Sequence, residues 1–231
     1  MLTIIPTPIG NLEDITLRAI RCLRETDYIA VEDTRHASIL LRHLEISKPL
    51  ISFHEHNEAA RSIELVSRMK GGQKVALISD AGMPGISDPG YRLIRLCIQE
   101  NLPFTVLPGP SAILTALVGS GFPLDKFYFG GFLPNKSGRR LTELQQAVNR
   151  QETSLYFESP HRLVKSLTAL TEISPCISVC VARELSKKFE EYRRGNAIDV
   201  LNHFTKHSPK GEIVLLIQGG LEIEKAPDLS Q

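Results

Sequence analysis

Apolar and polar positions along the first half of the chain follow two alternating patterns. Short apolar runs predict strands at 2–6, 28–33, 50–56, 74–79 and 104–108. Between them, apolar residues at helical spacing predict helices at 14–25, 36–44, 58–70, 90–100 and 111–120, the first of them capped by Asp14. This repeated strand-then-helix order predicts an α/β domain with a mostly parallel sheet and helices on both faces.

The pattern changes in the stretch 119–134, which is rich in Gly, Pro and aromatic residues. We expect the domain boundary at about 115–123, between domains 1–117 and 118–231. Beyond it the pattern predicts helices at 137–149, 160–172 and 197–207 and strands at 153–159, 176–185 and 212–220. The stretch "KKFEEYRRG" (187–195) reads as a polar span without a predicted element. The second half is therefore a second α/β domain.

Composition and charge narrow the class of protein. The 231 residues are 42% hydrophobic and 23% charged, which is the balance of a folded globular protein. The formal charge of +1 argues against electrostatic attraction of nucleic acid by the whole molecule. A local basic face would still be able to bind nucleic acid. The start "MLTIIPTPIG" lacks a signal-peptide pattern, and no apolar run reaches 18 residues, so we expect a cytoplasmic protein without a membrane partner.

The four cysteines form no C-x-x-C motif. Cys176 and Cys180 would share one face of an extended chain. Buried free thiols are favoured over a zinc site or a disulfide.

Four loops follow predicted strands of the first half: 6–11, 32–36, 79–90 and 108–112. Ligands of open α/β sheets bind beyond the carboxyl ends of the strands, and all four loops mix Gly or Pro with small polar residues. A single such loop is most often a tight turn between strand and helix. Four of them at one edge of the sheet favour a binding site.

Neither the P-loop motif nor the dinucleotide fingerprint G-x-G-x-x-G occurs in these loops, so phosphate cradling is disfavoured. A metal site would use His54 and His56, placed on one face of a strand, with Asp80 or Asp88. An H-x-H pair without a third placed ligand is a weak signal. Polar residues that leave a strand more often make ordinary loop hydrogen bonds, and we predict no metal.

Charged loops also follow strands of the second half, at 156–162 and 181–188. They are either a solvated helix start and an exposed loop or one wall of a cleft that faces an anionic partner such as an RNA backbone. The basic stretch "NKSGRR" (135–140) adds Lys136, Arg139 and Arg140 to the second interpretation.

An ordered series of motifs resembles one known family. The series comprises "PTPIGNLEDITLRAI", "AVEDTRH", "SFHEHN", "LISDAGMPGISDPGYRLI", "PGPSAILTAL", "FYFGGFLP", "YFESPHRL" and "VARELSKK". It is similar to the 16S ribosomal RNA (cytidine-2'-O)-methyltransferases of the tetrapyrrole methylase superfamily, from about residue 2 to residue 219. The resemblance implies two α/β domains, with a mostly parallel N-terminal sheet and a mixed C-terminal sheet. It further implies a homodimer that binds S-adenosylmethionine in the cleft between its domains and modifies 16S rRNA in the small ribosomal subunit.

The resemblance also implies residue roles. The implied cofactor contacts are Pro8, Ile9, Asp80, Gly82, Ile86, Ser111 and Ala112, with Phe157 and Ala182 from the second domain. Substrate contacts are expected from Asn11, Arg35, His161 and Arg162, because their loops should open on the same cleft. Because a ribose hydroxyl is a weak acid, Glu184 is the candidate base, and Arg183 or Lys187 would stabilise the developing alkoxide.

Two features depart from the family pattern. Met83 stands where the family has Thr in "SDAGTP", so a hydroxyl contact at that position would be lost. The sequence ends soon after "EIVLLIQGG", where many members continue into a small helical extension. RNA would then be held without that extension or with the help of a partner.

Two other functions stay open at this stage. The same fold would serve a tetrapyrrole (porphyrin or corrin) methyltransferase, although "EDTRH", "ESPHR" and "RELSKK" favour RNA. A ribosome-assembly factor without catalysis would keep the fold and lose turnover. The intact Asp80-Ala81-Gly82 sequence argues against that reading.

Overall fold

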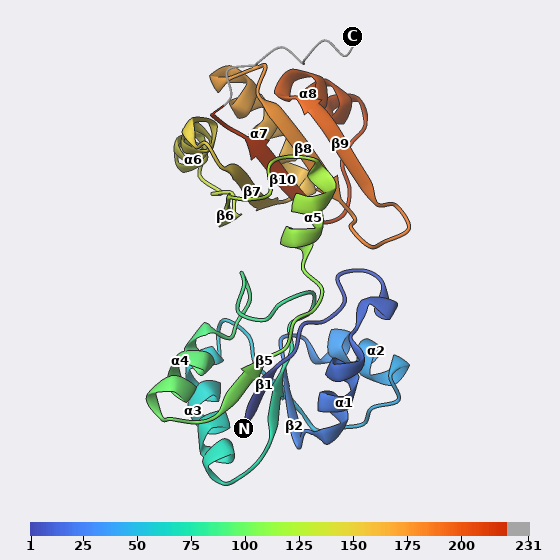
Figure 1. Ribbon diagram of the computed structural model, residues 1–231, viewed down its shortest axis with the longest axis vertical. Coiled ribbons are helices and arrows are strands. Elements are labelled where there is room, and N and C mark those ends of the chain that lie inside the picture. The colour runs from blue at the N-terminus through green and yellow to red at the C-terminus, as the bar shows by residue number, and fades with distance from the viewer. Residues whose placement is uncertain (221–231) are drawn as a thin grey trace. The chain divides into compact units, whose positions relative to one another are not determined.

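The computed structural model describes residues 1–220. The chain folds into two compact units, of which the first comprises Met1–Ala112 and the second begins at Ile113 (Figure 1). Each unit is a sheet covered by helices. The expected α/β class is therefore confirmed for both halves.

The sheet of the first unit is entirely parallel, with strand order β3-β2-β4-β1-β5. Its strands are β1 (Leu2–Ile4), β2 (Tyr28–Val31), β3 (Leu50–Ser52), β4 (Val75–Leu77) and β5 (Phe104–Val106). The connecting segments are the 3₁₀ helix η1 (Leu12–Asp14) and helices α1 (Leu17–Glu25), α2 (Thr34–His43), α3 (Glu58–Lys70) and α4 (Tyr91–Gln99). All five strands end at the same edge, because they are parallel.

Helices cover both faces of this sheet (Figure 1). Leu23 of α1 and Leu40 of α2 pack with Val31 in one apolar cluster, whereas Leu65 of α3 and Leu93 of α4 belong to the cluster on the other face. The start of α1 differs from the prediction. Thr16 is its N-cap, since the Thr16 hydroxyl accepts a hydrogen bond from the Ala19 amide at 3.0 Å, and Asp14 belongs to the preceding 3₁₀ turn.

The sheet of the second unit is mixed, with strand order β6-β7-β10-β8-β9. Its strands are β6 (Phe127–Phe132), β7 (Thr153–Glu158), β8 (Ser178–Arg183), β9 (Glu191–Asn196) and β10 (Ile213–Gln218). The pair of β6 and β7 is parallel, and the other pairs are antiparallel. This arrangement confirms the mixed sheet that the resemblance implied.

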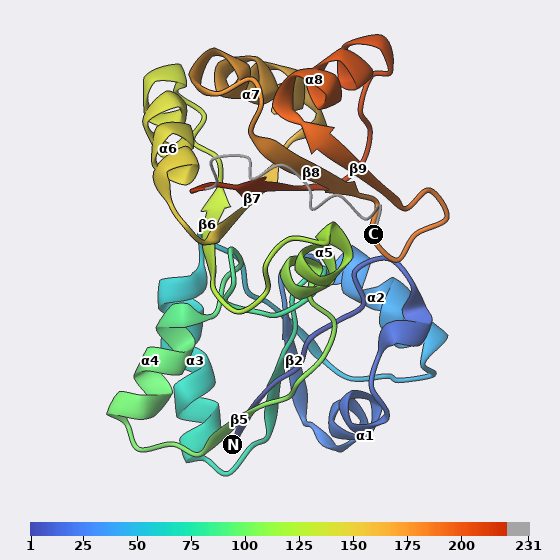
Figure 2. The same cartoon turned by 45° about the horizontal axis from the view of Figure 1, so that its top comes forward.

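Helices α6 (Ser137–Asn149), α7 (Pro160–Ile173) and α8 (Ala197–Lys206) lie together on one face of this sheet (Figure 2). They bury Leu144, Leu167 and Phe204 against strand residues such as Leu215. Helix α5 (Ala112–Ser120) lies on the opposite face (Figure 2). Tyr192 and Arg194 of β9 hold it through backbone carbonyl groups, with the Tyr192 hydroxyl 3.2 Å from the oxygen of Thr115.

Two strands were missed in the sequence, and both are edge strands. β6 lies in the aromatic stretch interpreted as a boundary, and β9 in the span interpreted as polar. All four cysteines are free, as predicted, but Cys176 is exposed and Cys22 is only partly buried. Within residues 1–220, no helix is both long and apolar enough to cross a membrane.

Candidate functional site

The four loops singled out in the sequence lie at the carboxyl edge of the first sheet. Strands β4, β1 and β5 are direct neighbours, so the loops that follow them emerge side by side. The loop after β2 joins them through the Asp33 amide, which donates to the Asp80 carboxylate at 3.2 Å. The predicted clustering of these loops is thus found in the structure.

Thr7 and Gly82 tie the first and third of these loops together. Their backbones form a two-way bridge, with N–H to O distances of 2.9 and 3.0 Å. The Thr7 hydroxyl donates to the carbonyl of Ser79, and the Ser79 hydroxyl donates to the carbonyl of Gly82, both at 3.0 Å. Because these bonds occupy the amide and both lone pairs of Gly82, this glycine offers a close approach rather than a hydrogen bond to a ligand.

Gly82 also marks the point where three loops meet. Its φ of +82° favours glycine, and a Cβ placed there would lie 3.5 Å from the Ile9 side chain and 3.9 Å from the Pro110 carbonyl oxygen. A Cβ on Gly109 would lie 2.9 Å from Pro6. The backbones therefore approach one another closely at this edge of the sheet.

Glu58, the first residue of α3, anchors the far end of the long loop. Its carboxylate accepts hydrogen bonds from the amides of Gly90 at 2.9 Å and Arg92 at 3.2 Å, and so caps α4. The side chain of Arg92 completes an ion pair with it at 3.7 Å. No local sequence pattern indicates this role, because Glu58 lies 32 residues before Gly90.

Three carboxyl groups crowd the same loops. Burial, followed by the nearby charges of Glu32 and Asp80, raises the pKa of Asp88 from 3.8 to about 7. Burial and the charge of Asp80 likewise raise the pKa of Glu32. A positively charged ligand would reduce the repulsion between these three carboxyl groups.

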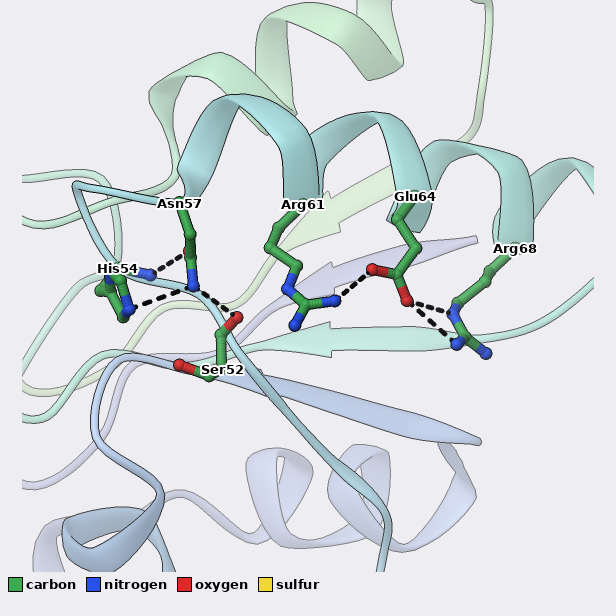
Figure 3. Close-up of polar contacts among 6 residues, drawn as sticks. All are labelled: Ser52, His54, Asn57, Arg61, Glu64 and Arg68. Atoms are coloured by element: carbon green, nitrogen blue, oxygen red, sulfur yellow. Dashed lines mark hydrogen bonds and ion pairs between the residues drawn. The ribbon is translucent and has the colours of Figure 1, made fainter.

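His54 and His56 do not lie on a strand, as the disfavoured metal alternative required. β3 ends at Ser52, and a turn follows in which the Asn57 side chain accepts from the His54 amide at 2.9 Å and donates to the Ser52 carbonyl at 3.2 Å (Figure 3). The Asn57 amide also lies 3.1 Å from Nε2 of His54. In the described part of the chain, no group of three or more His, Cys, Asp and Glu side chains is arranged to hold a metal ion.

The remaining candidates of the first unit have varied surroundings. Pro8 and Ile9 are buried and Ile86 is exposed, while Ser111 and Ala112 are partly buried at the start of α5. Met83 packs against the apolar cluster beneath α3 and α4. The position that departs from the family pattern therefore has a structural role in this chain.

The two substrate candidates of the first unit are surface residues. The Asn11 side chain caps the 3₁₀ turn by accepting from the Glu13 amide at 3.1 Å. The Arg35 side chain is 91% exposed and pairs with Asp33 at 2.8 Å. Hydrogen bonds from Arg35 lower the pKa of Asp33 to about 2.

Two candidates of the second unit share one row of its sheet. Phe157 of β7 and Ala182 of β8 both pair with Val214 of β10. Directly paired residues point to the same face, so Phe157 and Ala182 lie on the face opposite α6, α7 and α8. Arg183 follows Ala182 and points to the other face, where it pairs with Glu191 at 2.5 Å. The structure thus separates Arg183 from Ala182.

Arg162 is held on all sides. It pairs at 2.7 Å with Glu158, whose side chain is fully buried, and donates to the Leu133 carbonyl at 3.1 Å and to the Asn135 side chain. His161 beside it is exposed. We predicted a substrate contact for both residues. In the structure, Arg162 instead supports the segment 133–135.

Glu184 and Lys187 form a small ion-pair network with Glu212. Lys187 lies 2.9 Å from Glu184 and 3.1 Å from Glu212, and the Glu212 amide donates to the Glu184 carboxylate at 3.1 Å. The hydrogen bond from Lys187 lowers the pKa of Glu184. Glu184 is therefore ionised at neutral pH.

Comparison with known proteins places the chain in a family. Residues 1–200 match the model of the tetrapyrrole (corrin/porphyrin) methylases. A protein of Thermotoga maritima named ribosomal RNA small subunit methyltransferase I is 47% identical, over 94% of this chain and 98% of the relative. The protein of the same name from Hydrogenobaculum sp. is 48% identical, over 94% of each chain.

Solved structures agree with this assignment at the level of the fold. The crystal structure of uroporphyrin-III-C-methyltransferase from Thermus thermophilus matches 93% of this chain with a TM-score of 0.64 at 18% identity. The X-ray structure of cobalt precorrin-4 methyltransferase, a cobalamin biosynthetic enzyme, matches 93% with a TM-score of 0.67 at 17% identity. The chain belongs to the tetrapyrrole methylase family of methyltransferases, together with the proteins named ribosomal RNA small subunit methyltransferase I.

Proposed function

We propose that this methyltransferase uses S-adenosylmethionine to methylate the ribose 2'-hydroxyl of a cytidine in the 16S rRNA of the small ribosomal subunit. The observation that carries the proposal is the near full-length identity of 40–48% to relatives whose printed name specifies small-subunit ribosomal RNA. The motifs of the loops after β1, β2, β4 and β5 support it, because they lie together at one sheet edge.

The residues at this edge fit S-adenosylmethionine in charge. When bound, this cofactor supplies a methyl group on a positively charged sulfur, which a ribose oxygen takes in an in-line displacement while the hydroxyl proton leaves. Asp80, with Glu32 and Asp88 nearby, supplies negative charge for a cationic ligand. Gly82 brings its loop close to Ile9 and Pro110, so the three loops would present one continuous backbone surface to a ligand.

The chain has two tasks in this reaction, which are to align the reacting groups and to remove the proton. Alignment alone can provide about 7–11 kcal/mol of the barrier reduction. The backbone bridge of Thr7 and Gly82 and the cap by Glu58 serve it by fixing the loops. Pro8, Ile86, Ser111, Ala112, Phe157 and Ala182 remain the proposed further cofactor contacts.

Glu184 is the proposed base, because it is ionised at neutral pH and its partner Lys187 would stabilise the alkoxide. Arg183 is the weakest of the three catalytic candidates, since it is engaged with Glu191 on the other face of the sheet. Among the proposed RNA contacts, His161 and Arg35 are exposed and Asn11 lies at the surface. Arg162 would act by holding the segment 133–135.

Glu184→Gln tests the role of the base, and Glu212→Gln is the matched control because both carboxylates pair with Lys187. We expect Glu184→Gln to lower kcat by about 100-fold or more, as general bases contribute 10²–10⁴-fold. Cofactor binding by calorimetry should stay unchanged in both variants. Equal kcat in the two variants would exclude Glu184 as the base.

The substrate is tested by incubating the protein with labelled S-adenosylmethionine and either small ribosomal subunits from cells that lack the gene or a porphyrinoid. We expect label in the RNA alone. Label in the porphyrinoid would establish tetrapyrrole methylation instead. Absence of cofactor binding would support a ribosome-assembly factor without catalysis.

We also propose that the protein is cytoplasmic, in keeping with its proposed RNA substrate, and that it forms a homodimer. Helix α5 supports the dimer, because it is apolar around most of its circumference and leaves Leu114 and Val118 more than half exposed. Light scattering should give twice the chain mass for the wild type. Val118→Glu should lower it if α5 contributes to the interface.

A further inference from the structure

Phe132, the last residue of β6, exposes 60% of its surface. Its ring is nevertheless held in a defined place. It lies 5.3 Å from the ring of Phe157, which also contacts Phe129 at 5.1 Å. The three rings therefore form an aromatic cluster with Phe132 at its solvent side.

A bulge in β6 directs Phe132 to this position. Residues three apart in a regular strand point to opposite faces, yet Phe129 and Phe132 both reach Phe157. The register with β7 shifts between them at Gly130 and Gly131, where φ of Gly131 is +67°. A Cβ on Gly130 would lie 2.3 Å from the Tyr156 ring, so this bulge requires glycine. Bulges often re-aim a side chain next to a functional site.

The chain after Phe132 is fixed and basic. Leu133 is buried, its amide donates to the Phe157 carbonyl at 3.1 Å, and Arg162 holds its carbonyl. Exposed cations follow at Lys136 and Arg139. A rigid exposed ring next to positive charges is the combination that proteins use to hold single-stranded nucleic acid.

We propose that Phe132 is a stacking platform for an unpaired base of the RNA substrate, with the neighbouring phosphates on Lys136 and Arg139. This inference rests on the proposed function. A base on Phe132 would lie next to Phe157, the residue proposed above as a cofactor contact. The platform would therefore place a nucleotide beside the methyl donor. Stacking accepts any base, so Phe132 would supply position rather than identity.

Three variants test the platform. Phe132→Leu removes the ring and keeps an apolar side chain, Phe132→Trp keeps a stacking surface, and Phe127→Leu is the control on the same strand, where Phe127 is 42% exposed. Binding is measured with a fluorescent oligocytidine decamer, and KM with small subunits from cells that lack the gene. Cofactor binding is measured by calorimetry, and chain mass by light scattering.

Loss of one base stack is worth about 1–3 kcal/mol, so Phe132→Leu should weaken decamer binding by about 5- to 150-fold and raise KM for the subunit. Phe132→Trp and Phe127→Leu should bind within about threefold of the wild type. The affinity for the cofactor in calorimetry and the mass in light scattering should be the same for all variants and the wild type.

Wild-type RNA binding by Phe132→Leu would overturn the inference. Loss of cofactor binding would assign the ring to the cofactor pocket, and loss of a dimer would assign it to a second copy of the chain, so either result would also overturn it. A wild-type protein that methylates no small-subunit RNA contradicts the proposed function. Methylation by Phe132→Leu at wild-type kcat and KM contradicts only the platform.

Discussion

The two units build their candidate sites from different parts of the polypeptide. In the first unit, backbone groups hold the loops in place, through the bridge of Thr7 and Gly82 and the amides that Glu58 caps. In the second unit, side-chain contacts shape the site, through the ion pair of Arg162 with the buried Glu158 and the ion pairs of Lys187. The first site should therefore be sensitive to added bulk at glycine, and the second to the loss of charge.

Gly82→Ala should have the largest effect on binding. The added Cβ would make ordinary contacts with Ile9 and the Pro110 carbonyl, but it would strain the backbone at φ of +82° and displace a ligand that approaches the glycine. We expect cofactor affinity to fall by about 5- to 150-fold, which corresponds to about 1–3 kcal/mol. Gly72→Ala is the matched control, because Gly72 has φ of +86° and nothing within 4 Å of the added Cβ. Both should lower the free energy of unfolding by about 1 kcal/mol. Equal cofactor affinity in the two variants, measured by calorimetry, would show that Gly82 does not face the ligand.

Arg162→Ala should have the largest effect on stability. It leaves the buried Glu158 carboxylate without its ion-pair partner, which costs about 3–5 kcal/mol. Arg139→Ala, at an exposed position of α6, should change the unfolding midpoint little. Urea denaturation of both variants measures the difference. If Arg162→Ala lowers the free energy of unfolding by less than about 1 kcal/mol, Arg162 has no structural role. It would then be a candidate for direct contact with RNA.

Glu58→Ala should destabilise the protein by about 2 kcal/mol, because two amides lose their acceptor. Glu64→Ala on the same helix removes ion pairs with Arg61 and Arg68 that are partly open to solvent, and it should cost less than about 1 kcal/mol (Figure 3). Glu58→Ala should also weaken cofactor binding, since the cap fixes the end of the loop 79–90. If Glu58→Ala and Glu64→Ala lower the free energy of unfolding by similar amounts in urea denaturation, Glu58 does not stabilise the start of α4 as a cap.

Asp88 makes stability depend on pH in a direction opposite to that of most carboxyl groups. Its pKa is raised from 3.8 to about 7 by burial, then by the charges of Glu32 and Asp80, and a hydrogen bond with Ser79 opposes the shift. The folded state therefore holds the proton more tightly than the unfolded state. This contribution to stability is fully present below pH 4 and is lost as the pH rises through 7.

Asp88→Asn should remove this pH dependence. At pH 8 the variant should be more stable than the wild type by on the order of 1–2 kcal/mol, less than the full shift corresponds to because Asp88 is partly exposed. Urea denaturation at pH 5 and pH 8 measures the difference. Parallel behaviour of the two proteins across this range would rule out a raised pKa at Asp88.

The sequence allowed most of the fold to be predicted, and the failures share a cause. The buried strand β4 is apolar throughout, and β10 is apolar up to its last residue, Gln218, so both strands stand out in the sequence. The two missed strands, β6 and β9, are edge strands, with one partner each and exposed residues that break the apolar pattern. Propensity alone cannot separate such strands from loops.

The part of the candidate site that follows from the parallel order of the strands was predictable from the sequence. Parallel strands end at one edge, so the order of elements was enough to bring Pro8, Asp80 and Ser111 onto neighbouring loops. Glu58 was missed because its partners lie far away in the sequence. Ala182 and Arg183 are neighbours in a strand and must point to opposite faces, but which of the two faces the helices cover depends on tertiary packing, which the sequence does not define.

Mass spectrometry of 16S rRNA fragments from cells with and without the gene would detect the proposed methyl mark itself. We expect one cytidine that carries a ribose methyl group in the presence of the gene and is lighter by about 14 Da in its absence, the mass that a methyl group adds. Complementation with the wild-type gene should restore the mark, and Gly72→Ala should do so better than Gly82→Ala. Identical fragment masses in the two strains would contradict the account.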